Sequence, residues 1–452
     1  MTSSTSPRTP SAAHSVLTAL LAAPLLAGSL LAAPLLVASL SGCGDDGHPP
    51  TAPADMSIYF DAGDGGRIRR DASSDDGGPF DPDAEVVDGG VRGCHLEGEP
   101  LKLATDAIDH SVRLVDVALS GTTFVVAWTD ARTAVDDLYV YGWPAAEASG
   151  TEHRVTEDYS LTRDAQLGAR ADGFMVSWVD NLTGSYELYA RPLDAMGAPS
   201  GPAQRLTNNL LREDSPRVTG LGGPTTMVAW LESDGSGGPS VTYALPLSPT
   251  GAAVGTPATA TAAPRSPSEL TLSRLGTGAA LAWNESGSVY LQPLTSAGAM
   301  IGLPTPINTE ANANGSAALA LDETGGGVAF GVRVGGARPE IRMRTVGPTG
   351  ATRGPEAILT PPPSTGADPT IVAYATGYVV AYRTSAADGT GMIRLVFATY
   401  NGEYSSSMDV AETTAIGGAP RIAIAADGRM LIAWMSGDLT SAAVNAAKVV
   451  CE

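Results

Sequence analysis

One short motif returns seven times along this chain at nearly even steps, and it limits the folds that the chain can adopt. The first copy is Val126-Ala127-Trp128, an aliphatic residue, a small residue and an aromatic ring. The seven aromatic positions of this core motif are Trp128, Trp178, Trp230, Trp283, Phe330, Tyr382 and Trp434. The steps between them are 50, 52, 53, 47, 52 and 52 residues. Repeats of this length are typical of arrays of similar sheets, so we expect one repetitive unit.

Each repeat can be divided into four short strands with turns rich in Gly, Asp, Asn and Pro between them. In the second repeat these strands are expected at residues 164–169, 173–179, 187–193 and 203–207. Residues 124–128, which contain the core motif, are apolar at successive positions, so both faces of this strand should be buried. Blades packed face to face around an axis provide that environment, with the small residue leaving room for the ring of a neighbouring blade. The sequence therefore predicts an all-β, seven-bladed β-propeller over residues 94–452.

A second marker follows the core motif in every repeat. The third strands carry Tyr139, Tyr189, Tyr243, Tyr290, Ile341, Ile393 and the apolar run 442–450. Several of these strands are followed by a Gly-x-x-x-Gly segment, which begins at Gly197, Gly251, Gly298 and Gly350. Such spacing also occurs in membrane helix dimers, but here it lies between strands, so we interpret it as hairpin turns with positive φ.

The two ends of the repeat array complement each other. After Trp434 the chain offers only one more strand, at 442–450, so the seventh blade lacks an outer strand. Residues 99–105 match the fourth-strand form of residues 201–207 but precede the first blade, so we expect them to pair with the last one. Antiparallel pairing would bring Cys94 close to Cys451. We predict a disulfide between them; two unpaired thiols are the alternative.

Residues 1–42 have the pattern of an export signal, with an uncharged Leu/Ala run at 17–40. The run ends in Leu40-Ser41-Gly42-Cys43, which resembles the bacterial lipobox. That resemblance implies a diacylglyceryl group on the Cys43 thiol and cleavage just before it. A membrane-spanning helix of about 24 residues is the alternative. Gly44 stands where an inner-membrane retention signal would have Asp, so we expect a lipid-anchored protein outside the cytoplasm, in the cell envelope, with the outer membrane favoured.

Residues 43–93 form an acidic segment between the predicted anchor and the repeats. It contains eleven Asp and one Glu, many Gly and few large apolar residues. Such a composition cannot bury enough surface to offset the entropy of ordering, so we expect a disordered tether that begins with the lipidated Cys43. Asp81, Asp83 and Asp88 could suggest calcium, but the full alternating-ligand loop with its terminal Glu is missing.

Residues 178–194 resemble a repeat that is common in secreted bacterial β-propellers. In that repeat a Trp-x-Asp turn leads into a Leu-Tyr strand and a Gly hairpin, as Trp178, Asp180 and Tyr189 do here. Trp128 with Asp130 is the other good match. The resemblance covers residues 95–451 and implies the fold, with no activity attached. The chain is also similar in outline to propeller lipoproteins that scaffold envelope assembly, and this similarity concerns architecture alone.

Charge and motif content exclude several functions. The formal net charge is −21, of which residues 94–452 carry −14, so nucleic acid is not an expected partner. Only Lys102 and Lys448 are lysines, which we interpret as compositional bias without functional weight. No His-x-x-x-His or Cys-x-x-Cys spacing occurs, and Ser233-Asp234-Gly235 does not complete a sialidase Asp box. We therefore expect no cofactor, no metal site and no catalytic residue.

Four acidic residues stand two positions beyond the aromatic ring of the core motif. These rim acids are Asp130, Asp180, Glu232 and Glu285. They are either ordinary solvated turns or a face that binds a cationic ligand, a metal ion or a basic protein surface. We expect a monomeric, non-catalytic binding or scaffold module for a protein or glycan of the envelope or beyond it. The alternative is a carbohydrate-active enzyme, a glycosidase or lyase, that uses carboxylates on the same face.

Overall fold

The computed structural model describes eleven ranges of the chain. They are residues 93–105, 112–133, 135–157, 162–236, 239–261, 267–334, 338–360, 364–384, 390–414, 418–438 and 441–451. The predicted signal peptide, Cys43 and the tether up to residue 92 lie outside the described residues. Within the described ranges, no helix is long and apolar enough to cross a membrane.

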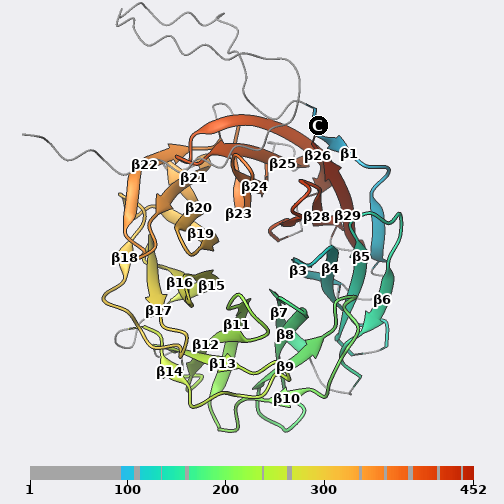
Figure 1. Ribbon diagram of the computed structural model, residues 1–452, viewed down its shortest axis with the longest axis vertical. Coiled ribbons are helices and arrows are strands. Elements are labelled where there is room, and N and C mark those ends of the chain that lie inside the picture. The colour runs from blue at the N-terminus through green and yellow to red at the C-terminus, as the bar shows by residue number, and fades with distance from the viewer. Residues whose placement is uncertain are drawn as a thin grey trace, which may run out of the picture. The chain divides into compact units, whose positions relative to one another are not determined.

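Seven antiparallel sheets make up the folded unit, which contains the repeats (Figure 1). The innermost strands of blades 1 to 7 are β3 (Arg113–Ser120), β7 (Thr162–Arg170), β11 (Arg212–Gly220), β15 (Ser268–Leu275), β19 (Ala313–Asp322), β23 (Ala367–Tyr374) and β27 (Arg421–Ile424). The second strands are β4 (Thr123–Asp130), β8 (Gly173–Asp180), β12 (Thr226–Ser233), β16 (Gly278–Glu285), β20 (Gly325–Val334), β24 (Gly377–Arg383) and β28 (Met430–Asp438).

The outer half of each blade follows the same order. The third strands are β5 (Asp137–Pro144), β9 (Glu187–Leu193), β13 (Val241–Leu247), β17 (Ser288–Leu294), β21 (Arg338–Val346), β25 (Thr390–Thr399) and β29 (Ser441–Val450). The outer strands of blades 1 to 6 are β6 (Thr151–Arg154), β10 (Gln204–Arg205), β14 (Ala258–Thr259), β18 (Thr305–Pro306), β22 (Thr352–Ile358) and β26 (Tyr404–Thr414). Each innermost strand contacts the next, and β27 contacts β3, so the ring is closed (Figure 1). The predicted seven-bladed β-propeller is confirmed.

The core motif packs the blades against one another. Every residue of β4 is buried, as expected for a strand with a sheet on either side. Ala127 of blade 1 lies in one apolar cluster with Trp178 of blade 2. Ala433 of blade 7 shares a cluster with Trp128 of blade 1 in the same way. The small residue therefore does receive the ring of the next blade.

The second marker supports the ring of the first from within the same blade. Trp128 is the cross-strand partner of Tyr139, and their ring centroids lie 6.1 Å apart in a stacked arrangement. The same stacking joins the Trp and Tyr of blades 2, 3 and 4, at 5.8, 5.6 and 5.6 Å. A pair of this kind contributes about 0.5–1.5 kcal/mol beyond the area that it buries.

The predicted Gly hairpins reach over the preceding blade. Gly197 has φ 84°, and a Cβ at this position would lie 3.1 Å from Cγ2 of Val125 in blade 1. Gly350 repeats the arrangement against blade 4, where a Cβ would lie 2.8 Å from Cγ of Pro293. These turns therefore require glycine for its backbone conformation and for the close approach.

The outer strand of blade 2 is shorter than predicted. Residues 203–207 were expected to form a strand, but β10 contains only Gln204 and Arg205. The pairing with β9 continues without strand geometry, because the backbone N–H of Leu188 donates to Oγ1 of Thr207 at 2.8 Å. Thr156, Asn308 and Thr360 accept a backbone N–H in the same way in blades 1, 4 and 5.

The N-terminal segment completes the seventh blade, as the sequence predicts. β1 (His95–Leu96) and β2 (Leu101–Thr105) both pair antiparallel with β29. His95 lies opposite Val450, which places Cys94 beside Cys451. Their sulfur atoms are 2.07 Å apart, so the pair is compatible with the predicted disulfide.

Lys448, one of the two lysines, joins the last blade to the first. Its side chain, only 4 % exposed, donates hydrogen bonds from Nζ to the carbonyl oxygens of Pro144, Ala145 and Glu147. Nζ also lies 4.6 Å from the centre of the Trp143 ring. Burial lowers the pKa of Lys448. The blade 1 hairpin is thus held to blade 7 by one buried ammonium group.

We expect Lys448→Met to lower the free energy of unfolding by about 2–4 kcal/mol, because three carbonyl groups lose their common donor. The midpoint of urea unfolding, followed by tryptophan fluorescence, measures the effect. Lys102→Met is the matched control, because Lys102 is exposed on β2, and its midpoint should stay at the wild-type value. Equal midpoints for both variants would contradict the role assigned to Lys448.

Candidate functional site

The first two rim acids are buried inside their turns. Asp130 is 4 % exposed and Asp180 is 1 % exposed. Oδ1 of Asp130 accepts the backbone N–H of Arg132 at 2.8 Å, and Oδ1 of Asp180 accepts that of Leu182 at 2.7 Å. Oδ2 of Asp130 also pairs with the Arg132 guanidinium at 2.6 Å. Both carboxylates therefore shape the turn between the second and third strands instead of facing solvent.

Directly opposite these residues stand two acids that sequence reasoning missed. Asp137 pairs with Asp130 in the strand register, and Glu187 pairs with Asp180. Asp137 is fully buried and forms an ion pair with Arg154 at 2.6 Å. Blade 1 thus pairs the buried carboxylate of Asp137 with an arginine of its outer strand.

Glu187 is equally buried and pairs with Arg205 at 2.7 Å. Burial opposes its ionisation, but hydrogen bonds from Ser185, Thr207 and Arg205 hold the pKa of Glu187 below its ordinary value. The sequence does contain a signal for these buried ion pairs. In blades 1 and 2 an acid stands seven residues after the Asp of the Trp-x-Asp turn, and an arginine follows on the outer strand.

The other two rim acids are half-buried in the turns of blades 3 and 4. Oε2 of Glu232 accepts a hydrogen bond from the Asn209 amide at 3.0 Å. The same amide donates to Oε1 of Glu213 at 3.2 Å, and Glu213 is completely buried. Burial, followed by the charges of Glu187 and Glu232, raises the pKa of Glu213 to about 7. The rim acids Asp130, Asp180, Glu232 and Glu285 thus belong to separate turns with different degrees of burial.

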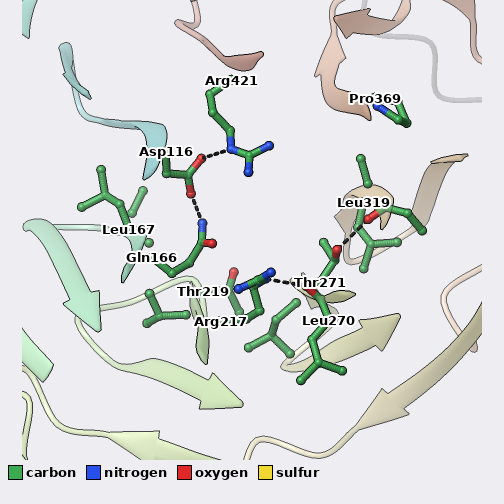
Figure 2. Close-up of a pocket in the computed structure, with 16 residues that line it drawn as sticks. Asp116, Gln166, Leu167, Arg217, Thr219, Leu270, Thr271, Leu319, Pro369 and Arg421 are labelled. Atoms are coloured by element: carbon green, nitrogen blue, oxygen red, sulfur yellow. Dashed lines mark hydrogen bonds and ion pairs between the residues drawn. The ribbon is translucent and has the colours of Figure 1, made fainter. Parts of the chain in front are cut away.

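A more coherent group of polar side chains lies on the axis of the propeller. Each innermost strand places one residue opposite the small residue of the core motif in the register. This channel ring consists of Asp116, Gln166, Arg217, Thr271, Ala318, Thr370 and Arg421. Five of its charged or polar members and Ala318 line a cavity of about 250 Å³, shown in Figure 2. We call it the channel cavity.

A β-bulge precedes the channel ring in most of the innermost strands. Asp164, Ser215, Glu269 and Asp368 have φ between 50° and 56° at these bulges, a conformation that is uncommon for residues other than glycine. Bulges of this kind bend a strand and change the direction of its side chains. They are therefore the local feature that separates the channel ring from the preceding turn.

Two acids at these bulges approach each other over Gly315. Oε2 of Glu269 and Oδ1 of Asp368 lie 3.7 and 4.0 Å from the position that a Cβ at Gly315 would occupy. Burial, followed by the charge of Asp368, raises the pKa of Glu269. Asp368 also pairs with Arg383 at 3.2 Å. The structure thus identifies a pair of neighbouring carboxylates that the sequence could not single out.

The charges of the channel cavity are unequal. Nε of Arg421 lies 3.8 Å from Oδ1 of Asp116, and the Gln166 amide donates to Oδ2 (Figure 2). Arg217 donates instead to two carbonyl oxygens, those of Leu270 and Pro216, and forms no ion pair with any described residue. The cavity therefore contains two guanidinium groups and one carboxyl group.

The pKa shifts reflect this crowding. Burial raises the pKa of Asp116 to about 6, although the Arg421 charge opposes the change. Burial, followed by the charge of Arg421, lowers the pKa of Arg217 to about 10. Both shifts follow from the burial of one carboxyl group and two guanidinium groups in the same cavity.

A second cavity of about 330 Å³ continues the channel toward the turns of blades 1 and 2. We call it the outer cavity. It shares Gln166, Arg217 and Arg421 with the channel cavity and adds Asp136 and Arg163. Arg163 stacks on the Tyr186 ring at 3.7 Å. The two cavities together give the axis a polar lining that reaches the face where the rim acids were predicted.

A signal for the channel ring is present in the sequence, at a nearly fixed distance from the core motif. Each member stands 12 or 13 residues before the aromatic residue of its core motif. Aligning the repeats on that residue would have shown a position that varies from Asp to Arg while its surroundings stay apolar. Within the described residues, no three His, Cys, Asp or Glu side chains are grouped as metal ligands would be.

Comparison with protein-family models and with curated protein sequences finds no match. Three solved structures illustrate what the chain is similar to. The β-propeller domain of the Trilobed protease from Pyrococcus furiosus is 8 % identical with a TM-score of 0.43, over 75 % of this chain and 94 % of that one. Trypanosoma rangeli sialidase is 10 % identical with a TM-score of 0.40, over 79 % and 60 %. TolB from Acinetobacter baumannii is 15 % identical with a TM-score of 0.35, over 69 % and 56 %. The matched part therefore spans less than two thirds of the sialidase and of TolB.

We expect the stability of the propeller to fall as the pH rises from about 4.5 to about 7, because the folded chain keeps the Glu213 proton that the unfolded chain releases. Glu213→Gln should remove this part of the pH dependence and raise the free energy of unfolding near pH 8 by about 1–3 kcal/mol. Urea unfolding at several pH values measures both effects. The exposed Glu323→Gln serves as control and should follow the wild-type profile. A Glu213→Gln profile parallel to wild type would refute this assignment.

Proposed function

We propose that this chain is a lipid-anchored binding module outside the cytoplasm that takes its ligand into the axial channel. One observation carries the proposal: strands from the whole length of the repeat array bring their unlike polar residues to a single cavity. The first two rim acids, by contrast, are engaged in their own turns. Polar groups that converge in a concave site are the usual feature of ligand binding.

The lipid anchor and the location outside the cytoplasm belong to the same proposal. The lipobox-like Cys43 and the acidic tether at 43–93 support a propeller held at the surface of a membrane, with the outer membrane favoured. A disulfide between Cys94 and Cys451 would be consistent with export to an oxidising compartment. The partner that we propose is a protein or glycan of the envelope or beyond it, bound by a monomer.

We expect Cys43→Ala to move the protein from the membrane fraction to the soluble fraction, because it removes the thiol that would be acylated. Fractionation of cells followed by immunoblotting measures the distribution. Ser39→Ala changes a nearby residue and keeps the cysteine, so this control should remain with membranes. If Cys43→Ala stays bound after washing without detergent, a membrane-spanning segment replaces the lipid anchor.

A photo-crosslinking residue in place of Asp136 should capture the ligand, because Asp136 lines the outer cavity. The matched control replaces the exposed Asp427, which lies in the turn between β27 and β28 and lines neither axial cavity. Adducts formed in cells are detected by a mobility shift and identified by mass spectrometry. An adduct that forms at Asp136 alone supports the channel as the binding site. Equal adducts at both positions would place binding elsewhere.

A carbohydrate-active enzyme is the second candidate, and the paired carboxylates of Glu269 and Asp368 favour it. Glycosidases use two carboxyl groups, one of which has a raised pKa and acts as an acid. Burial and Asp368 raise the pKa of Glu269 in this sense. Cleavage of a polysaccharide by the wild-type chain, lost in Glu269→Gln and Asp368→Asn with folding intact, would establish this candidate in place of the first.

A further inference from the structure

Arginine side chains gather on the axis of a strongly acidic protein. The chain has a formal net charge of −21. Arg113, Arg163, Arg217 and Arg421 nevertheless line the outer cavity together with two acids, Asp136 and Asp164. Arg163 forms an ion pair with Asp214 at 3.5 Å, as the arginines in the turns of blades 1 and 2 do with their carboxylates, whereas Arg217 forms no ion pair with any described residue.

Arg217 and Arg421 extend into both cavities from strands that are not neighbours. Arg217 belongs to blade 3 and Arg421 to blade 7, and Figure 2 shows both side chains extending into the same cavity. The charge of Arg421 contributes to the lowered pKa of Arg217. Among the residues that line the channel cavity, Asp116 has the one carboxyl group, 3.8 Å from Arg421, and the charges of Asp164 and Glu269 also act on Arg217. Both guanidinium groups also donate to backbone carbonyl oxygens, Arg217 to those of Leu270 and Pro216 and Arg421 to that of Val115. Two guanidinium groups that share one cavity can hold an anion between them.

We propose that Arg217 and Arg421 bind the carboxylate group of a small organic anion in the channel cavity. This inference rests on the axial channel being the binding site, and it names the chemical group bound there, a carboxylate, which an acidic sugar of a glycan or a small free acid would present. A guanidinium group presents its N–H donors in a planar fork that fits the two oxygens of a carboxylate. The Gln166 amide and the Thr271 hydroxyl group line the same cavity and can provide further polar contacts.

The cavity also limits the size of the ligand. Its volume of about 250 Å³ is below the range of about 300–1,000 Å³ that is usual for drug-sized ligands. The polar side chains of Gln166 and Thr271 line the cavity beside the two arginines, which suits a ligand with hydroxyl groups. A small hydroxy acid or sugar acid meets both conditions. Inorganic phosphate and sulfate share the oxyanion chemistry and are separate arms of the test.

Asp116 distinguishes this binding role from a structural one. The negative charge of its carboxyl group offsets part of the positive charge that the two arginines present to an anion. Asp116→Asn removes that negative charge and should tighten anion binding by about 3-fold or more. Arg421, Arg217 and Gln166 are the charged and polar groups that face it. If the arginines served only to hold Asp116 in place, the same substitution would loosen the cavity and weaken binding.

Isothermal titration of the full-length protein in detergent provides the test, with glucuronate, malate, inorganic phosphate and sulfate as probes. We expect glucuronate or malate to bind with a dissociation constant below about 1 mM. Arg217→Gln and Arg421→Gln should each weaken binding about 10-fold or more, and Arg421→Lys less than Arg421→Gln. Arg429→Gln, which removes an equal charge in the turn that leads into β28, should leave binding unchanged. Circular dichroism and thermal unfolding establish that each variant is folded.

Three results would overturn the proposal: no carboxylate probe binds, the Arg217 and Arg421 variants bind as wild type does, or only phosphate and sulfate bind. An unfolded Arg217→Gln leaves Asp116→Asn and Arg421→Lys as independent measurements with opposite expected signs. Failure of the carboxylate assignment is separable from failure of the binding module. If the crosslink at Asp136 persists while no carboxylate binds, the module stands and only its ligand class is wrong.

Discussion

The packing of an aromatic ring against a small residue of the preceding blade is the interaction on which the whole structure depends. It fixes the distance between blades, and it requires the second strand of each blade to be apolar on both faces, as β4 is. It also has a cost. Within the described residues, the indole Nε1 atoms of Trp128, Trp178, Trp230 and Trp283 have no hydrogen-bond acceptor. Each such group costs about 1–3 kcal/mol, which burial of the large ring and its stacking on tyrosine must exceed.

Closing the ring also requires contacts between the first and last blades, which the repeated interface alone does not complete. In this chain those contacts come from segments that do not repeat. β2 supplies the strand that blade 7 lacks, and Lys448 binds the hairpin of blade 1 where the other blades use a glycine turn. The closure therefore combines a backbone ladder, a cysteine pair and a buried ammonium group, none of which the core motif itself provides.

The sequence predicted those parts of the fold in which packing restricts the residue type. It did not predict the parts in which packing leaves the residue type open. The core motif predicted seven blades because every copy must fill the same space, and residues 99–105 predicted the closure because they copy an outer strand. The role of Lys448 could not be foreseen, since its three carbonyl partners lie about 300 residues away in the sequence. The burial of Asp130 and Asp180 depends on Asp137, Glu187 and their arginines, which meet them only through the strand register.

The channel ring escaped prediction for the opposite reason, because its members differ. A residue that faces the axis has no neighbouring blade to fit, so packing does not force the seven positions to be alike. Asp116 and Arg421 belong to blades 1 and 7, and their contact crosses the seam where the ring closes. The geometry of that pair therefore depends on the non-repeating parts, Lys448 and the β2 strand, that hold the seam together. In this propeller the same region that completes the fold also sets the distance between the charged groups of the candidate site.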